Sequence, residues 1–124
     1  MPWLLRDGRV LASVEVAASL RERTRGLLGR DAVDGVLLLR PARSVHTIGM
    51  KFPIDVAFCT VQDDGLVVLR TTTLRPHRVT MPVWKARCVL EAEAGAFERW
   101  GVVEGDQLQL RGEANDGDEG AGPG

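Results

Sequence analysis

The residues of this chain that could carry chemistry gather in one stretch, residues 44–59, which reads SVHTIGMKFPIDVAFC. It contains a titratable imidazole at His46, two backbone-shaping residues at Gly49 and Pro53, and a lone carboxylate at Asp55. Glycine permits positive φ or the close approach of another group, whereas proline fixes its own φ and donates no hydrogen bond. This combination is typical of a backbone corner beside a cleft, so we expect the candidate site here.

A binding site made of polar side chains around this corner is the favoured hypothesis. His46, Asp55 and Glu91 would line a shallow polar cleft, with Gly49 and Met50 beside them. Such a site needs only convergent polar groups next to a backbone that a ligand can approach closely. The sequence therefore predicts a non-enzymatic binding module with these five ligand-binding residues. It predicts no catalytic residue, no metal ligand and no cofactor.

Two other kinds of site stay open as alternatives. A hydrolase or thiol-dependent enzyme would use Cys59 or Cys88 as the nucleophile, with a histidine base within about 3 Å. No local signature surrounds either cysteine, and both fall in strand-like segments where small side chains pack. A metal-binding protein would combine His46 and His77 with a cysteine or a carboxylate. Zinc ligands usually come in closely spaced pairs, and this sequence has no such pair.

Each polar candidate also has a purely structural interpretation. Asp55 follows a proline corner at the start of a strand, where an aspartate can accept nearby backbone N–H groups. Glu91 lies inside an apolar strand and would need a partner if buried. Arg70, on a strand that could neighbour it, is the candidate partner. His46 can equally be a hydrogen-bonded structural histidine.

The elements that must position these residues are mostly short strands. Alternating or continuously apolar segments occupy residues 10–16, 35–39, 54–62, 66–72, 86–93 and 107–110. Ser19 and Glu22 form a capping box, which predicts one main helix near residues 20–28, ended by Gly29. Residues 95–100 predict one or two further helical turns. We therefore expect an α+β fold with a mainly antiparallel, strongly curved or barrel-like β-sheet.

Length and composition indicate a single compact domain. The chain has 124 residues, of which 44% are hydrophobic, enough to form a core. It carries 16 Lys and Arg against 17 Asp and Glu, a formal charge of −1, whereas a dedicated nucleic-acid binder would show a basic excess. Beyond Leu110 the chain is rich in Gly, Asp and Glu. We expect a domain at residues 1–110 and a disordered acidic tail at residues 111–124.

Location and partners follow from what the sequence lacks. No segment approaches the roughly 20 apolar residues of a membrane span, and the N-terminus does not have the pattern of a signal peptide. We expect a cytoplasmic monomer that binds a small molecule or a protein partner, with no nucleic acid and no membrane. In a reducing compartment the two cysteines should be free thiols.

Several segments, in the same order, resemble the domain of unknown function 192 family. They are Arg25-Gly26-Leu27-Leu28-Gly29-Arg30 after the helix start, the central stretch, and Leu90-Glu91-Ala92-Glu93-Ala94-Gly95 followed by Gly105-Asp106. Where many members carry Trp-Met-Lys-Asn-Thr ahead of Pro-Leu-Asp, this chain has residues 46–50 ahead of residues 53–55. The resemblance spans about residues 9–110 and implies a compact, mainly β domain with no established reaction. The matching positions are Pro53, Asp55, Phe58, Glu91, Gly95, Gly105 and Asp106.

Overall fold

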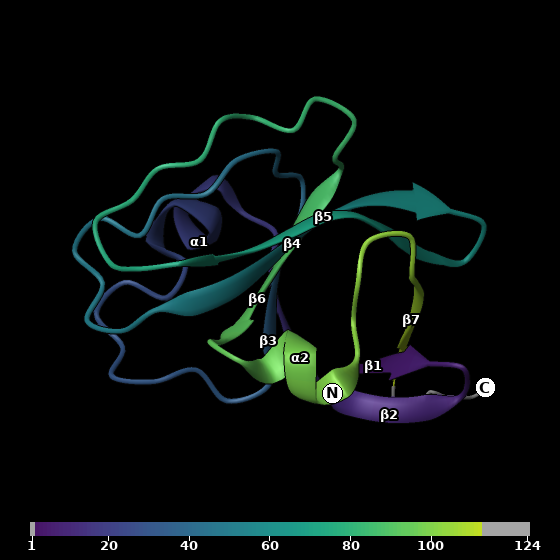
Figure 1. Ribbon diagram of the computed structural model, residues 1–124. Coiled ribbons are helices and arrows are strands. Elements are labelled where there is room, and N and C mark those ends of the chain that lie inside the picture. Colours follow the sequence, from purple (N-terminus) through teal and green to yellow (C-terminus); the bar gives the residue numbers. More distant parts are fainter. Residues whose placement is uncertain (1, 113–124) are drawn as a thin grey trace.

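The computed structural model describes residues 2–112, and within them seven strands close into a barrel (Figure 1). The order around the barrel is β1-β2-β3-β6-β4-β5-β7. The strands are β1 (Trp3–Arg6), β2 (Arg9–Ala17), β3 (Val36–Leu39), β4 (Ile54–Gln62), β5 (Gly65–Leu74), β6 (Cys88–Glu93) and β7 (Gln107–Arg111). Two short helices, α1 (Leu20–Arg25) and α2 (Ala96–Trp100), complete the fold. The prediction of an α+β fold with a barrel-like sheet is confirmed.

Among the described strands, one neighbouring pair is parallel and the others are antiparallel. β2 and β3 run parallel, with Val14 opposite Val36 and Ala17 opposite Leu39. A parallel pair cannot be joined by a tight hairpin, so the chain must cross over between the two strands. The crossover is residues 18–35 and contains α1. It carries α1 onto the outer surface of the barrel.

The capping box starts α1 as the sequence predicts. The Ser19 hydroxyl accepts a hydrogen bond from the Glu22 N–H, and the Glu22 carboxylate accepts one from the Ser19 N–H, each at 3.1 Å. The helix ends at Arg25, however, before the predicted end at residue 28. Gly26 takes φ 50° and closes the helix, because its N–H bonds back to the Glu22 carbonyl. Leu27 still packs inward and is buried.

Side-chain alternation divides the apolar residues into two cores. One core fills the barrel and includes Leu4, Val14, Val36, Leu38, Ala57, Cys59, Cys88, Leu90 and Ala92. The other lies against the outer face of β3, β4 and β6 and includes Leu27, Leu37, Val45, Met50, Val56, Phe58 and Val89. Successive residues of a strand point to opposite faces, so one strand contributes to both cores. The consequence is that β4 and β6 are buried on both faces.

The outer core is covered by α1 and by two loop segments, residues 40–51 and 75–87, which we call the outer ribbon. The two segments pair antiparallel: Val83 N–H donates to the Arg43 carbonyl at 2.8 Å, and Thr80 N–H donates to the Val45 carbonyl at 2.9 Å. The pairing also includes an isolated antiparallel bridge between His46 and Val79. The prolines on both segments limit a regular ladder. In Figure 1 the second segment arches over the sheet.

The C-terminal prediction can be compared with the structure at two residues, Arg111 and Gly112. Arg111, which the sequence assigns to the tail, is the last residue of β7 and pairs with Trp3. The remainder of the predicted tail, from residue 113, lies outside the described residues. In the described part of the chain, no helix is both long enough and apolar enough to cross a bilayer.

The two cysteines, distant in sequence, face each other across β4 and β6. Cys59 pairs directly with Cys88, and both are free thiols with no exposed surface. The hydrogen bond with Cys88, together with burial, raises the pKa of the Cys59 thiol. The Cys59 thiol is therefore not a thiolate at neutral pH, whereas the same hydrogen bond lowers the pKa of the Cys88 thiol.

We predict that neither thiol of the native protein reacts readily with a chromogenic thiol reagent. After unfolding in guanidinium chloride without any reductant, both should react, because burial and not oxidation protects them. The measurement is a thiol titration before and after unfolding. Rapid titration of either cysteine in the native state would contradict this placement, and so would the need for a reductant after unfolding.

Candidate functional site

Asp55 and Glu91 lie on opposite faces of the same sheet. Asp55 on β4 pairs with Ala92, which belongs to the barrel core. Glu91 on β6 pairs with Val56 and Leu37, which belong to the outer core. Directly opposite residues of an antiparallel pair share a face. The structure therefore does not bring the three predicted polar residues into one cleft: it separates Asp55 from Glu91.

Asp55 is surrounded by hydrogen-bond donors of the protein itself. One carboxylate oxygen accepts from the Thr73 hydroxyl at 2.7 Å, and the other accepts from the backbone N–H groups of Gly95 at 3.0 Å and Phe97 at 3.1 Å. Gly95 is the N-cap residue of α2 and has no side chain to cap the helix. Asp55, a buried residue of β4 with 4% exposed, caps the start of α2 instead. Its geometry matches the structural interpretation, in which it accepts backbone N–H groups.

Glu91 instead forms the floor of a pocket of about 150 Å³ on the outer face of the sheet. α1 and the turn after it form one wall, and the outer ribbon forms the opposite wall. The lining residues from α1 and its turn are Arg23, Arg25, Gly26, Leu27 and Leu28. Those from β3 and the ribbon are Leu39, Ser44, Val45, His46, Ile48, Met50 and Val79. Of the five predicted site residues, the structure thus brings His46, Met50 and Glu91 together.

Glu91 is almost fully buried, with 3% of the residue exposed. Burial raises its pKa to about 7, because a charged carboxylate is poorly stabilised away from water. Among the side chains that the structure describes, none makes a hydrogen bond or an ion pair with this carboxyl group. The predicted partner, Arg70, is exposed on β5 opposite Phe58 and does not pair with it. Glu91 is therefore a buried acid whose polar atoms face the pocket without a described partner.

Gly49 shapes the pocket indirectly. It has φ +83°, and a Cβ atom built on it would lie 2.8 Å from a methyl group of Leu28. Glycine at this position therefore lets the turn after α1 close against the ribbon. Its N–H donates to Nδ1 of His77 at 3.3 Å, a contact that joins the two ribbon segments. The sequence suggested Gly49 as a point of close approach, and here the group that approaches is Leu28.

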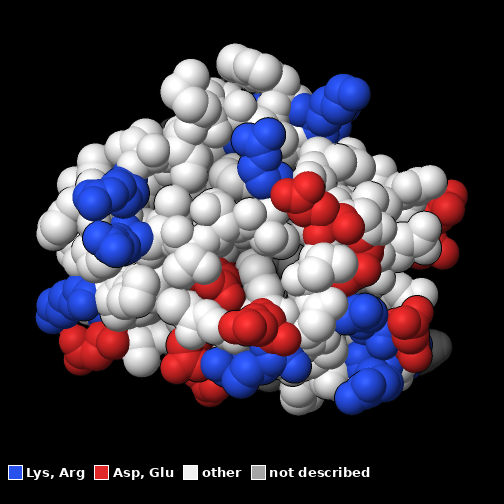
Figure 2. Space-filling view, in the orientation of Figure 1, with Lys and Arg blue, Asp and Glu red and all other residues white. Residues whose placement is uncertain are grey.

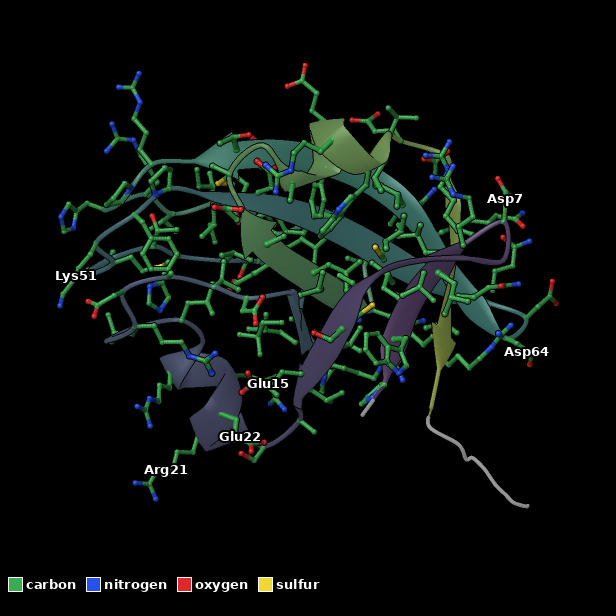
Figure 3. The ribbon with its side chains drawn as sticks, turned by 90° about the horizontal axis from the view of Figure 1, so that it is seen from below. Asp7, Glu15, Arg21, Glu22, Lys51 and Asp64 are labelled. Carbon is green, nitrogen blue, oxygen red and sulfur yellow. The ribbon has the colours of Figure 1, made fainter. Side chains whose placement is uncertain are left out.

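The arginines at the pocket mouth, Arg23 and Arg25, were not among the predicted site residues. Their spacing reads as an ordinary solvated helix face. Figure 3 shows the neighbouring side chains of α1, Arg21 and Glu22, pointing away from the barrel. No sequence signal places the end of α1 over β6, because that contact depends on the crossover between β2 and β3. In the structure, the turn at the end of α1 lies close to Glu91: a Cβ atom built on Gly26 would lie 3.9 Å from a Glu91 carboxylate oxygen.

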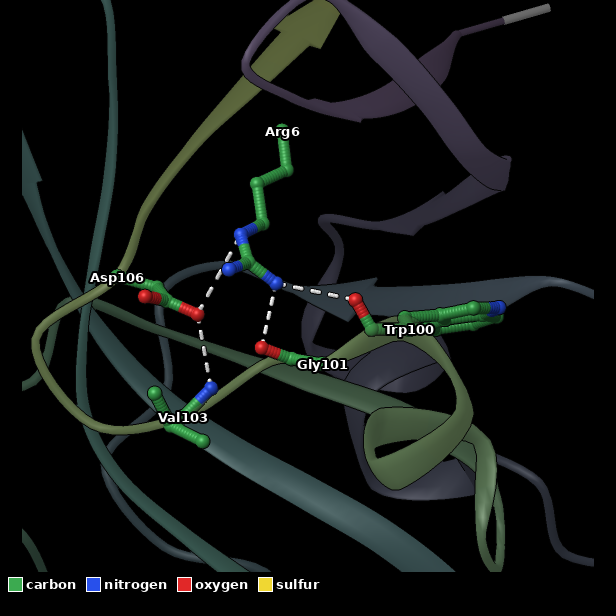
Figure 4. Close-up of polar contacts among 5 residues, drawn as sticks. All are labelled: Arg6, Trp100, Gly101, Val103 and Asp106. Carbon is green, nitrogen blue, oxygen red and sulfur yellow. Dashed lines mark hydrogen bonds and ion pairs between the residues drawn. The ribbon is translucent and has the colours of Figure 1, made fainter.

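The remaining acidic family position, Asp106, also has a structural setting (Figure 4). Its carboxylate accepts from the Val103 N–H at 2.9 Å and lies 3.7 Å from Nε of Arg6. The Arg6 guanidinium also donates to the carbonyls of Trp100 and Gly101. These contacts tie the loop after α2 to β1. Within residues 2–112, no cluster of three or more His, Cys, Asp or Glu side chains could hold a metal ion.

Comparison with known proteins places the chain among uncharacterised relatives. Residues 4–110 match the family model DUF192, described as "Uncharacterized ACR". The chain is 29% identical over 101 residues to the UPF0127 protein PH1112 of Pyrococcus horikoshii, an alignment that covers 77% of this chain and 85% of that protein. The UPF0127 protein PYRAB11210 of Pyrococcus abyssi is also 29% identical, over 77% of this chain and 84% of its own length.

Two crystal structures share the fold. One, from Sinorhizobium meliloti 1021, is described as a candidate transcription regulator; it has a TM-score of 0.72 and 26% identity, and the match covers 88% of this chain and 91% of that one. The other is a protein of unknown function from Novosphingobium aromaticivorans, with a TM-score of 0.67 and 16% identity, covering 87% and 82%. The second likeness shows the fold alone.

We predict that Asp55→Asn lowers the free energy of unfolding by about 1–3 kcal/mol, the range for loss of a charged hydrogen-bond partner. The amide cannot accept all three donors and would turn its own NH2 toward one of them. Urea unfolding measures the loss. The control is Asp64→Asn in the exposed turn between β4 and β5, which should leave the stability unchanged. Equal stability of the Asp55→Asn variant and the wild type would show that the carboxylate does not cap α2.

Glu91 should make the stability of the protein depend on pH. Its pKa is about 7 in the folded protein against 4.5 for an unperturbed glutamate, so folding favours the protonated form. This contribution is fully present below about pH 4.5 and is lost as the pH rises through about 7. The loss should approach about 3 kcal/mol relative to Glu91→Gln, whose side chain does not ionise. Urea unfolding of both proteins at about pH 5 and about pH 8 measures it. A constant difference would contradict the raised pKa.

Proposed function

This chain belongs to the DUF192 family of uncharacterised proteins. From the geometry of its pocket, we propose that it is a binding module for a small organic molecule. The ligand would occupy the pocket between α1, the outer ribbon and β6. Glu91 would bind its polar group, and His46 and Met50 would line the side formed by the ribbon.

The observation that carries this proposal is the state of the Glu91 carboxyl. A buried carboxyl without a hydrogen-bond partner costs free energy, because nothing replaces the water lost on folding. Asp55, on the same sheet, has three such donors from the protein. A buried acid with a strongly raised pKa that faces a pocket is a recognised sign of a functional site. A ligand with an N–H or O–H group would supply the missing donor.

The pocket limits the size and chemistry of the ligand. A cavity of about 150 Å³ holds a molecule about the size of benzene. Leu27, Leu39 and Met50 offer it apolar contacts. Glu91 provides one acceptor or, when protonated, one donor at the floor, and Arg25 lies at the mouth. These features favour a compact ligand with an apolar body and one hydrogen-bonding group directed at the floor.

The location of the cysteines favours binding over the thiol-enzyme alternative. Cys59 and Cys88 belong to the barrel core, whereas the pocket opens on the outer face of the sheet. A ligand in the pocket is therefore separated from both thiols by the sheet itself. Neither histidine shares a described contact with either sulfur atom.

We predict that Glu91→Leu makes the protein more stable at neutral pH and weakens ligand binding. The leucine has no charge to desolvate, and the substitution removes the acid at the pocket floor. A panel of small amines, amides and alcohols can be screened by the rise in melting temperature. Any compound that stabilises the wild type should bind the variant about ten-fold more weakly or worse, the effect of losing one charged hydrogen bond.

The matched control is Glu93→Gln, two residues along the same strand. Glu93 is exposed and pairs with Arg99 at 3.1 Å, so this change leaves the pocket intact. It should bind each compound as the wild type does. If Glu91→Leu instead destabilises the protein, or binds the same compounds equally well, Glu91 is a structural residue and the proposed site is wrong.

A further inference from the structure

The outer ribbon concentrates basic residues although the whole chain is close to neutral. Its two segments, residues 40–51 and 75–87, contain no aspartate and no glutamate. Their cations are Arg40, Arg43, Lys51, Arg75, Arg78, Lys85 and Arg87, and all seven residues are exposed. Lys51 pairs with Asp31 from outside the ribbon. The formal charge of −1 for the chain therefore hides an excess of positive charge in the ribbon segments.

The ribbon also carries large, exposed apolar side chains. Met81 is 82% exposed, Trp84 76% and Val79 68%, and Ile48 on the facing segment is 54% exposed. Single exposed apolar residues are ordinary, but several within one short loop mark an interaction surface. The upper edge of Figure 2, where residues 75–87 run in Figure 1, shows white and blue residues and no red ones.

Packing and hydrogen bonds fix the ribbon against the rest of the protein. The opposite face of the ribbon is buried in the outer core through Val45, Met50 and Ala86. The Thr47 hydroxyl donates to the Arg75 carbonyl at 2.6 Å and accepts from the Arg78 N–H at 2.9 Å. The inward apolar side chains of the ribbon therefore pack in the outer core. The outward apolar side chains stay exposed and belong to neither core of the described residues.

We propose that the outer ribbon binds the surface of an anionic lipid bilayer. Trp84 would lie at the level of the headgroups, where tryptophan is enriched in membrane proteins. Val79 and Met81 would enter the boundary with the acyl chains, as the apolar faces of peripheral proteins do. Arg78 and Lys85 would meet the phosphates, and each cation near an anionic surface adds about 1 kcal/mol. This proposal does not depend on the Glu91 pocket, and it departs from the expectation, drawn from the sequence, of no membrane partner.

The side-chain types favour a bilayer over a nucleic acid. Single-stranded nucleic acids bind on stacked aromatic rings beside cations, and the ribbon offers one large ring of this kind, Trp84, besides the imidazoles of His46 and His77. The aliphatic tips of Val79 and Met81 have no partner on a sugar-phosphate backbone, whereas acyl chains accept them directly. In Figure 3, Lys51 on the ribbon lies at the opposite end of the molecule from Asp7 and Asp64. Contact through the ribbon would keep those acids away from the anionic surface.

The test is co-sedimentation of the full chain with vesicles at low ionic strength. Vesicles of equal parts phosphatidylglycerol and phosphatidylcholine should bind the wild type, and vesicles of pure phosphatidylcholine should bind it far more weakly. Arg78→Gln with Lys85→Gln should weaken binding about 25-fold, since 1 kcal/mol per charge is about five-fold. Met81→Ser with Trp84→Ser should weaken it about ten-fold or more.

Matched variants on other surfaces serve as controls. Arg9→Gln with Arg70→Gln removes two exposed cations from strands β2 and β5, and Val10→Ser with Val103→Ser removes two exposed apolar side chains. Both control proteins should bind the anionic vesicles about as well as the wild type. Melting temperatures establish that every variant is folded before binding is compared.

Three outcomes would overturn the proposal. The first is no binding to the anionic vesicles by the folded wild type. The second is a loss of binding in the control variants equal to that in the ribbon variants. The third is binding that depends on Arg78 and Lys85 but not on Met81 and Trp84, together with equal retention on single-stranded DNA. That result would assign the ribbon to soluble polyanions and not to a bilayer.

Discussion

The burial of β4 and β6 on both faces is the constraint on which the rest of this structure depends. Every side chain along most of these strands must enter either the barrel core or the outer core. The barrel closes around the first, and α1 with the outer ribbon covers the second. An acidic residue in the doubly buried part of either strand, such as Asp55 or Glu91, therefore cannot reach solvent. Its carboxyl group either finds hydrogen-bond donors inside the protein or stays without them.

Asp55 and Glu91 meet this constraint in different ways. Asp55 faces the end of the barrel where α2 begins, and there backbone N–H groups are unpaired at the start of the helix. Three donors converge on its carboxylate. Glu91 faces the outer core, where Val56 and Leu37 are its cross-strand neighbours. The difference follows from which face each residue occupies, and it leaves Glu91 available for a ligand.

The covering layer gives the outer face both its pocket and its exposed surface. The parallel pairing of β2 with β3 requires a crossover, and the crossover brings the end of α1 over β6. Gly49 allows Leu28 to close against the ribbon, so the layer is tight at that point and open beside it. The ribbon directs Val45 and Met50 inward and Met81 and Trp84 outward. One short layer thus forms a wall of the pocket and presents a basic, apolar surface.

Much of the architecture could be derived from the sequence because its determinants are local. Alternation of apolar residues placed the strands, and Ser19 with Glu22 placed the start of α1. The resemblance to the family correctly indicated a compact, mainly β domain. Tertiary structure alone decided the candidate site. The face that each acid occupies depends on the pairing of β4 with β6, and the pairing of Cys59 with Cys88 depends on the same register. The position of α1 over Glu91 depends on the β2–β3 crossover. These relations join residues far apart in the chain, and no local pattern of side chains determines them.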